Sequence, residues 1–282
     1  MSGNTLLLVD GHNLLFQMFF GMPARILSRN GKPMQGTMGF VGALLKILRR
    51  VEPTHAVVLF DSEQENARAQ LDAQYKANRV DYAQVAEDEN PFSQLADVRA
   101  SLDFMRIRHT EVGEYETDDV IAAYVSACRE TAQIVISSFD SDFFQLIGDS
   151  VRVLRYRGEK TVLCDRAYVR DRCGVEPEQY ADFKALVGDA ADNIRGADKI
   201  GPKTAAKLLA DFGSLEQILA RAAEIDRPSV RDSVLRSGER LRINQRLIWL
   251  DGGAPIPFPL EALKFTDGGW KTSEVLRAIG LR

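Results

Sequence analysis

The chain has 282 residues, of which 45% are hydrophobic and 27% charged, proportions typical of a globular protein that buries a core. No apolar run approaches the roughly 18–20 residues that span a bilayer, and residues 1–4 lack a basic signal region, so we expect neither a membrane segment nor a signal peptide. The net charge of −4 argues against a uniformly basic protein, although an acidic total can conceal a basic face. Cys128, Cys164 and Cys173 show no metal-type spacing, which predicts reduced thiols in a cytoplasmic protein.

Three apolar runs end in aspartate, as buried parallel strands do where they enter a loop. These runs, Thr5–Gly11, His55–Asp61 and Ile134–Asp142, place Asp10, Asp61 and Asp140 at strand ends. Helical patterns lie between them, at residues 39–50, 93–104 and 120–129. The alternation predicts an α/β fold, a mostly parallel twisted sheet with helices on both faces. The ligand site of such a sheet lies at the carboxyl ends of its strands.

The stretch YETDDVIAAY (residues 115–124) sets three carboxylates, those of Glu116, Asp118 and Asp119, before an apolar helical run. Like charges this close raise one another's pKa unless a cation lies among them.

The second half of the chain predicts a hairpin at Val151–Leu163 and then a helix, a glycine-containing loop and two further helices over Asp182–Ala222. Asp189 and Asp192 lie three residues apart, a spacing that would place both on one side of a helical turn. The tail from Ile225 to Arg246 is helical and rich in arginine.

A single one of these acids is readily explained as a cap or a solvated surface group. The whole set is better explained by bound divalent cations, because oxygen-rich sites suit Mg²⁺ or Mn²⁺. With only three histidines in the chain, a zinc site is not expected. The set comprises Asp10, Asp61, Glu116, Asp118, Asp119, Asp140, Asp142, Asp189 and Asp192.

Clustered divalent ions held by carboxylates serve in-line displacement at phosphorus. Cations for the remaining phosphate charge occur in YKANR (residues 75–79), where Lys76 and Arg79 would lie on one helical face that Arg68 shares. We expect Lys76 and Arg79 to stabilise the transition state and Tyr75 to stack on a terminal base. The alternative for this basic segment is a solvated cationic helix face.

The segment KIGPKTAAKLL (residues 199–209) places glycine before a proline that starts a helix. Backbone N–H groups at such a helix start bind phosphate without reading bases. Lys203 and Thr204 lie beside these N–H groups.

Five motifs together resemble the bacterial and phage 5′-nucleases, which include free-standing flap endonucleases and the N-terminal domain of bacterial DNA polymerase I. They are LLLVDGHNL (6–14), FDSEQENARAQLDAQYKANR (60–79), YETDDVIA (115–122), ISSFDSDFFQL (136–146) and LVGDAADNIRGADKIGPKTAAKLL (186–209). The resemblance implies a PIN-like catalytic domain over residues 1–180 with a helical arch around 62–110. It also implies a helix–three-turn–helix (helix–hairpin–helix) DNA-binding module and C-terminal helices over residues 181–282. The DNA-contacting hairpin of that module would comprise Lys199, Ile200, Gly201, Pro202, Lys203 and Thr204.

The same resemblance implies two Mg²⁺ (or Mn²⁺) and a K⁺ held by hairpin carbonyls. By position these carbonyls belong to Leu186, Val187, Arg195, Ala197 and Ile200. It further implies a monomer that is functionally coupled to a DNA polymerase and a ligase. Two positions depart from the family pattern, Ser141 in place of a lysine and Gln70 in place of a carboxylate, and neither removes a metal ligand.

We therefore predict a Mg²⁺-dependent, structure-specific 5′-nuclease that acts on DNA with 5′ flaps, nicks or junctions. Asp10, Asp61, Glu116 and Asp118 are assigned to one ion, and Asp119, Asp140, Asp142, Asp189 and Asp192 to the other or its surroundings. Asp118 is the acid that we expect catalysis to need most. Two alternatives stay open, a non-catalytic DNA-junction-binding protein on the same scaffold and a PIN-like ribonuclease.

Overall fold

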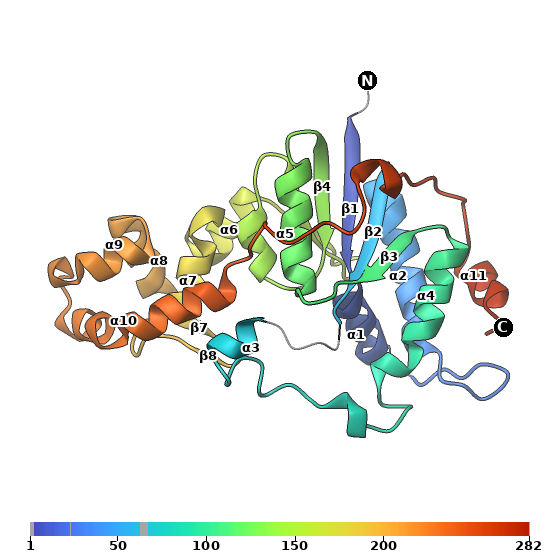
Figure 1. Ribbon diagram of the computed structural model, residues 1–282, viewed down its shortest axis with the longest axis horizontal. Coiled ribbons are helices and arrows are strands. Elements are labelled where there is room, and N and C mark those ends of the chain that lie inside the picture. The colour runs from blue at the N-terminus through green and yellow to red at the C-terminus, as the bar shows by residue number, and fades with distance from the viewer. Residues whose placement is uncertain (1–2, 23, 63–66, 282) are drawn as a thin grey trace.

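The computed structural model describes residues 3–22, 24–62 and 67–281, and its centre is a six-stranded sheet (Figure 1). The strand order is β3-β2-β1-β4-β5-β6, and each pair is parallel except β5 with β6. The strands are β1 (Asn4–Asp10), β2 (His55–Phe60), β3 (Arg108–Glu111), β4 (Ala132–Ser137), β5 (Val151–Arg155) and β6 (Val162–Cys164). The predicted fold class is thus confirmed, and so is the hairpin over residues 151–163.

The two faces of the sheet are covered by different helices, because successive side chains of a strand point to opposite sides. Leu6 and Leu8 of β1 face a core cluster that includes α5 (Thr117–Cys128). Leu7 and Val9 face a second cluster, formed with α1 (Gly11–Gly21), α2 (Gln35–Val51) and α4 (Leu95–Phe104). Burial on both faces explains why β1 is a continuous apolar run.

The connection from β2 to β3 corresponds to the predicted arch, and residues 63–66 of it lie outside the described residues. It contains α3 (Ala67–Leu71), the 3₁₀ helices η1 (Tyr82–Gln84) and η2 (Pro91–Gln94), and then α4. In Figure 1 it runs below the sheet from α3, beside β8, to the region of α1. The prediction that residues 75–79 are helical is wrong. They form turns, and Lys76 has the left-handed φ of 56°.

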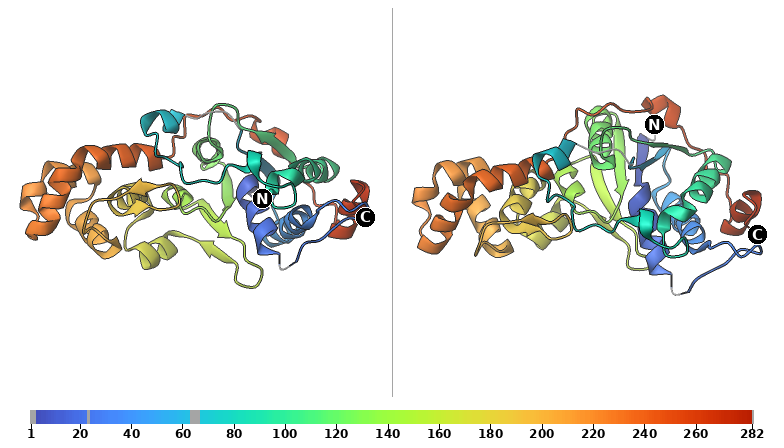
Figure 2. Two further views of the ribbon diagram at one scale, coloured as in Figure 1. Left: turned by 90° about the horizontal axis from the view of Figure 1, so that it is seen from below. Right: turned by 60° about the horizontal axis from the view of Figure 1, so that its bottom comes forward.

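The elements from α6 to α10 form an elongated, mostly helical module on the side of the sheet away from the C-terminal end of the chain (Figure 2). Their bounds are α6 (Arg166–Cys173), α7 (Tyr180–Val187), β7 (Gly188–Asp189), β8 (Ile194–Arg195), α8 (Pro202–Phe212), α9 (Leu215–Ala220) and α10 (Pro228–Ile248). The last helix, α11 (Thr272–Ala278), lies outside this module, against α2 and α4. Short 3₁₀ helices are η3 (Asp142–Leu146), η4 (Pro177–Gln179), η5 (Ala222–Glu224) and η6 (Leu260–Leu263). One cluster of buried apolar side chains continues from the sheet into this module, and a domain division at residue 180 stays a prediction.

After α10 the chain returns to the sheet. The backbone N–H of Phe265 donates to the carbonyl of Thr54 (2.8 Å), and Val275 of α11 packs in the core cluster of α2 and α4. Within the described ranges, every helix is too short or too polar to cross a membrane.

Candidate active site

An open cavity of about 840 Å³ lies at the carboxyl ends of the parallel strands. Four of the predicted metal-binding carboxylates line it: those of Asp10, Asp61, Asp118 and Asp140. Asp10 ends β1 and caps α1, accepting from the backbone N–H of Asn13 (3.0 Å) and the hydroxyl of Ser138 (2.9 Å). The strand ends and the start of α5 therefore meet, as the sequence predicted.

Two of these carboxylates are held in an environment that opposes their charge. Burial, together with the charge of Asp61, raises the pKa of Asp10 to about 7. Burial and the charge of Asp140 likewise raise the pKa of Asp118 well above its ordinary value. A divalent cation among these oxygens would reverse both shifts. The oxygen-only donor set thus fits Mg²⁺ or Mn²⁺.

A second acidic cluster lies beside the first. Ligand oxygens of Asp142, Asp189 and Asp192 lie within 4.8 Å of one another. Asp142 begins η3, Asp189 ends β7, and Asp192 lies in the turn between β7 and β8. The expected helical turn is wrong, but the turn between β7 and β8 brings Asp189 and Asp192 together. The triad has the geometry of a further cation site.

The side chain of Lys184, on α7, lies within this triad, a placement that the sequence analysis did not predict. Its buried ammonium group forms ion pairs with Asp142 and Asp189. Burial opposes the positive charge of Lys184, but the two carboxylates outweigh it and raise the lysine pKa. Burial also raises the pKa of Asp142 to about 7, although Lys184 opposes that shift. The available signal was a lone lysine inside the apolar run DFKALV.

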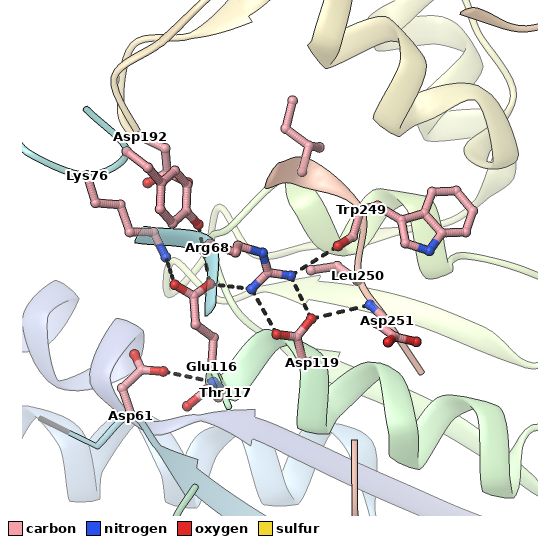
Figure 3. A network of polar contacts seen from close by, with 12 residues as sticks. Asp61, Arg68, Lys76, Glu116, Thr117, Asp119, Asp192, Trp249, Leu250 and Asp251 are labelled. Atoms are coloured by element: carbon pink, nitrogen blue, oxygen red, sulfur yellow. Dashed lines mark hydrogen bonds and ion pairs between the residues drawn. The ribbon is translucent and has the colours of Figure 1, made fainter. Parts of the chain in front are cut away.

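The basic residues of the arch reach into the acidic set (Figure 3). Lys76 Nζ lies 2.8 Å from Glu116 Oε1, and an Arg79 guanidinium nitrogen lies 3.0 Å from Asp192 Oδ1. Lys76 and Arg79 also line the main cavity. Each of these two cations is thus paired with a predicted metal-binding carboxylate.

Three predicted roles do not match the observed placements. Tyr75 is only 8% exposed and donates its hydroxyl to Glu116 (3.3 Å), so its ring is not available to stack on a base. Arg68 is also 8% exposed and is paired with Glu116 and Asp119 instead of facing DNA. Asp119, predicted as a metal ligand, does not line the cavity, and both its oxygens contact Arg68.

An aromatic wall, formed by Phe16, Tyr82 and Phe92, lines the same cavity and was not predicted. Its rings meet edge to face, with centroids 5.2–5.5 Å apart. Phe16 comes from α1, whereas Tyr82 and Phe92 come from η1 and η2 of the arch. Only the tertiary arrangement brings them together. The cavity thus combines carboxylates, cations and aromatic surface.

The predicted phosphate-binding hairpin lies between β8 and α8. Gly201 precedes Pro202, the first residue of α8, and Lys199 and Lys203 are exposed. Gly196 packs so closely on α7 that an added Cβ would lie 2.3 Å from the Val187 carbonyl oxygen and 2.5 Å from that of Leu186. The hairpin backbone and the end of α7 therefore form one tight unit.

Of the five carbonyls expected to bind K⁺, three already accept a protein hydrogen bond. Leu186 accepts from the N–H of Ala197 (2.9 Å), and Ala197 accepts from that of Ile200 (3.2 Å). Arg195 accepts from the side-chain amide of Asn244 (2.9 Å). Each carbonyl oxygen retains a second lone pair, so the set remains compatible with a cation.

This arrangement defines a class: an α/β protein whose acidic sheet edge suits metal-dependent cleavage of a nucleic-acid backbone. Residues 5–174 match the family model of the 5′-3′ exonuclease N-terminal resolvase-like domain. Residues 175–269 match that of the 5′-3′ exonuclease C-terminal SAM fold. The chain therefore belongs to the 5′-3′ exonuclease family, and the resemblance inferred from its motifs is confirmed.

Curated relatives include DNA polymerases I. The chain is 34% identical to that of Rhizobium leguminosarum over 269 residues, covering 93% of this chain and 26% of the polymerase. It is 37% identical to a thermostable enzyme of Thermus thermophilus over 242 residues, covering 86% of this chain and 28% of that protein. The chain thus spans less than a third of the length of these polymerases.

Two solved structures share the fold. T5 5′-exonuclease with bound zinc aligns at a TM-score of 0.74 and 23% identity, covering 98% of this chain and 100% of that chain. The catalytic core of Rad2 in complex with a DNA substrate aligns at a TM-score of 0.61 and 14% identity, covering 98% and 92%. At identities of 23% and 14%, the likeness to these two structures shows a shared fold and nothing further.

Proposed function

We propose that the protein is a divalent-metal-dependent, structure-specific 5′-nuclease that hydrolyses DNA phosphodiesters at 5′ flaps, nicks or junctions. The observation that carries the proposal is the pair of adjoining carboxylate clusters at the sheet edge, one in the cavity and one in the triad. The metal-bound T5 structure and the DNA-bound Rad2 structure support it through the shared fold.

The residues proposed to hold the ions fall into two groups. Asp10, Asp61, Glu116 and Asp118 form the first, and Asp140, Asp142, Asp189 and Asp192 form the second. When bound, two divalent ions supply an activated water and charge stabilisation for in-line displacement at phosphorus. Mg²⁺ and Mn²⁺ are the ions that this oxygen donor set favours.

The protein's own groups position the substrate. The ammonium group of Lys76 and the guanidinium of Arg79 line the cavity, where they neutralise charge that develops on the phosphate oxygens. The aromatic wall offers ring faces to unpaired bases of a single strand. The walls of the cavity thus match a phosphodiester next to an unpaired nucleotide.

The hairpin of Lys199, Ile200, Gly201, Pro202, Lys203 and Thr204 is proposed to grip the phosphates of the adjoining duplex. N–H groups at the start of α8 bind phosphate without sequence preference. A K⁺ held by the carbonyls of Leu186, Val187, Arg195, Ala197 and Ile200 would join that contact. Action as a monomer, and coupling to a DNA polymerase and a ligase, belong to the same proposal.

The test is cleavage of end-labelled flap, nicked and hairpin DNA, and of the matching RNA, in Mg²⁺, Mn²⁺ or EDTA. We expect cleavage of the branched DNA in either metal and none in EDTA. Binding without cleavage would favour a junction-binding protein, whereas preferential cleavage of the RNA would favour a PIN-like ribonuclease.

A further inference from the structure

The guanidinium group of Arg68 is the centre of a buried polar network (Figure 3). It donates to Glu116 Oε2 (2.5 Å), to both carboxylate oxygens of Asp119 (2.8 and 2.6 Å) and to the backbone carbonyl of Trp249 (3.0 Å). Burial opposes its charge, but Glu116 and Asp119 outweigh that effect and raise the Arg68 pKa. A permanently charged, forked donor thus joins three elements.

These elements belong to different parts of the fold. Arg68 lies on α3 at the base of the arch, Asp119 lies on α5, and Trp249 directly follows α10 of the C-terminal module. Asp119 also accepts from the backbone N–H of Asp251 (3.2 Å). The Arg68–Asp119 pair therefore fastens the exit of α10 to the arch base.

A second side chain supports the same exit. Gln145 of η3 donates to the carbonyl of Ile248 (2.9 Å) and accepts from the N–H of Leu250 (3.0 Å). Because η3 begins at Asp142, the segment 248–251 is connected to both carboxylate clusters. A shift of α10 would reach Glu116 through Arg68 and Asp142 through Gln145.

The neighbouring aspartates of α5 face different surroundings. Adjacent helical residues point about 100° apart. Among the described residues that line the cavity, Asp118 is present, whereas Asp119 is absent, as is Glu116, whose oxygens contact Lys76 and Arg68. Asp119 is 9% exposed, and both its oxygens are occupied by Arg68 in a two-point contact.

We propose that Asp119 is not a metal ligand, and that Arg68 and Asp119 are a pair of positioning residues which fix Glu116 and couple the C-terminal module to the carboxylate site. This inference rests on the proposed nuclease function only for its kinetic readout. The network itself predicts which substitutions weaken metal binding and which segments exchange faster when the network is broken. Both effects can be measured without DNA.

The first experiment compares Asp119→Asn with Asp118→Asn, the same isosteric change one residue earlier. Mn²⁺ binding to the DNA-free protein is measured by calorimetry. We expect Asp119→Asn to keep the stoichiometry and to change Kd less than about threefold, whereas Asp118→Asn weakens binding at least tenfold. Equal weakening in the two variants would make Asp119 a ligand and overturn the proposal.

The second experiment tests the coupling by hydrogen exchange in Arg68→Met and in Arg68→Lys, which keeps the charge without the fork. We expect faster exchange in residues 67–79 and at 249–251 in both variants, with less acceleration in Arg68→Lys. Exchange unchanged at either segment would overturn the coupling. Arg68→Lys keeps the test decisive if the methionine variant fails to fold.

The third readout is the single-turnover cleavage rate of flap DNA at saturating DNA and Mg²⁺, well below the unfolding temperature. Arg68→Met and Asp119→Asn should each lower it about 10- to 100-fold, and the double variant should be no slower than Arg68→Met alone. Wild-type-like rates in both single variants would overturn the positioning role. Failure of the wild type to cleave would instead refute the proposed function, and calorimetry and exchange would still decide the network's role.

Discussion

Replacement of Lys76 with alanine should impair chemistry far more than DNA binding. The Lys76 ammonium lies 2.8 Å from Glu116 Oε1 and lines the cavity. At an effective dielectric of about 20, charges at this separation attract by roughly 6 kcal/mol before desolvation is subtracted. Removal of one preorganised electrostatic donor commonly lowers a rate by roughly 10²–10³. We expect a loss of that size in the single-turnover rate.

The assay is rapid-quench cleavage of end-labelled flap DNA at saturating enzyme, extrapolated to saturating Mg²⁺ because Lys76 contacts a proposed ligand. Lys199→Ala is the matched control, since Lys199 has the same left-handed backbone (φ 62° against 56°) and lies in the hairpin. Lys199→Ala should weaken DNA binding and leave the saturated rate nearly unchanged. A Lys76→Ala rate within about threefold of wild type would refute electrostatic stabilisation by this lysine.

Three other changes have defined outcomes. Lys203→Ala should weaken duplex binding and reduce the slope of log affinity against log salt by about one, as measured by anisotropy titration, and an unchanged slope would remove Lys203 from the phosphate contact. Gly196→Ala should destabilise the hairpin and weaken duplex binding, because its Cβ would meet the Val187 carbonyl at 2.3 Å, whereas Gly148→Ala, with nothing within 4 Å, should be neutral in thermal unfolding and binding assays. The pKa of Asp10 is about 7 in the folded protein without metal, against about 3.9 in the unfolded chain. In EDTA, the contribution of Asp10 to the unfolding free energy is therefore present at low pH and lost as pH rises from about 4 to about 7. Denaturant titrations of Asp10→Asn should show a smaller fall in the unfolding free energy over this range, and a fall equal to that of the wild type would contradict this.

Local sequence was sufficient for β1, β2, β4 and the β5–β6 hairpin and for the acids at strand ends, but it did not indicate β3. Asp10 and Asp61 follow apolar runs long enough to be buried strands, and strand order does not change which end of each strand carries the acid. The acidic start of α5 was visible for the same reason. These features depend on neighbours along the chain, which the sequence shows directly.

The partners of these acids could not be inferred because they are set by tertiary contacts. The spacing of Lys76 and Arg79 suits a helix, but the Lys76 backbone N–H donates to the Asp192 carbonyl (3.0 Å) and the segment turns instead. Asp118 and Asp119 are indistinguishable in the sequence. In the fold, Asp119 is paired with Arg68, whereas Asp118 lines the cavity. Lys184 enters the triad only because α7 packs beside η3.

Catalysis by metal ions at the carboxylate cavity is tested most directly by release of a labelled 5′ flap by wild type and Asp118→Asn in Mg²⁺. Gel-shift binding of the same DNA in Ca²⁺ is measured alongside. The cavity geometry predicts Mg²⁺-dependent release by the wild type, none in EDTA, and loss of release by Asp118→Asn with DNA binding retained. Turnover by Asp118→Asn at the wild-type rate, or wild-type cleavage that persists in EDTA, would contradict it.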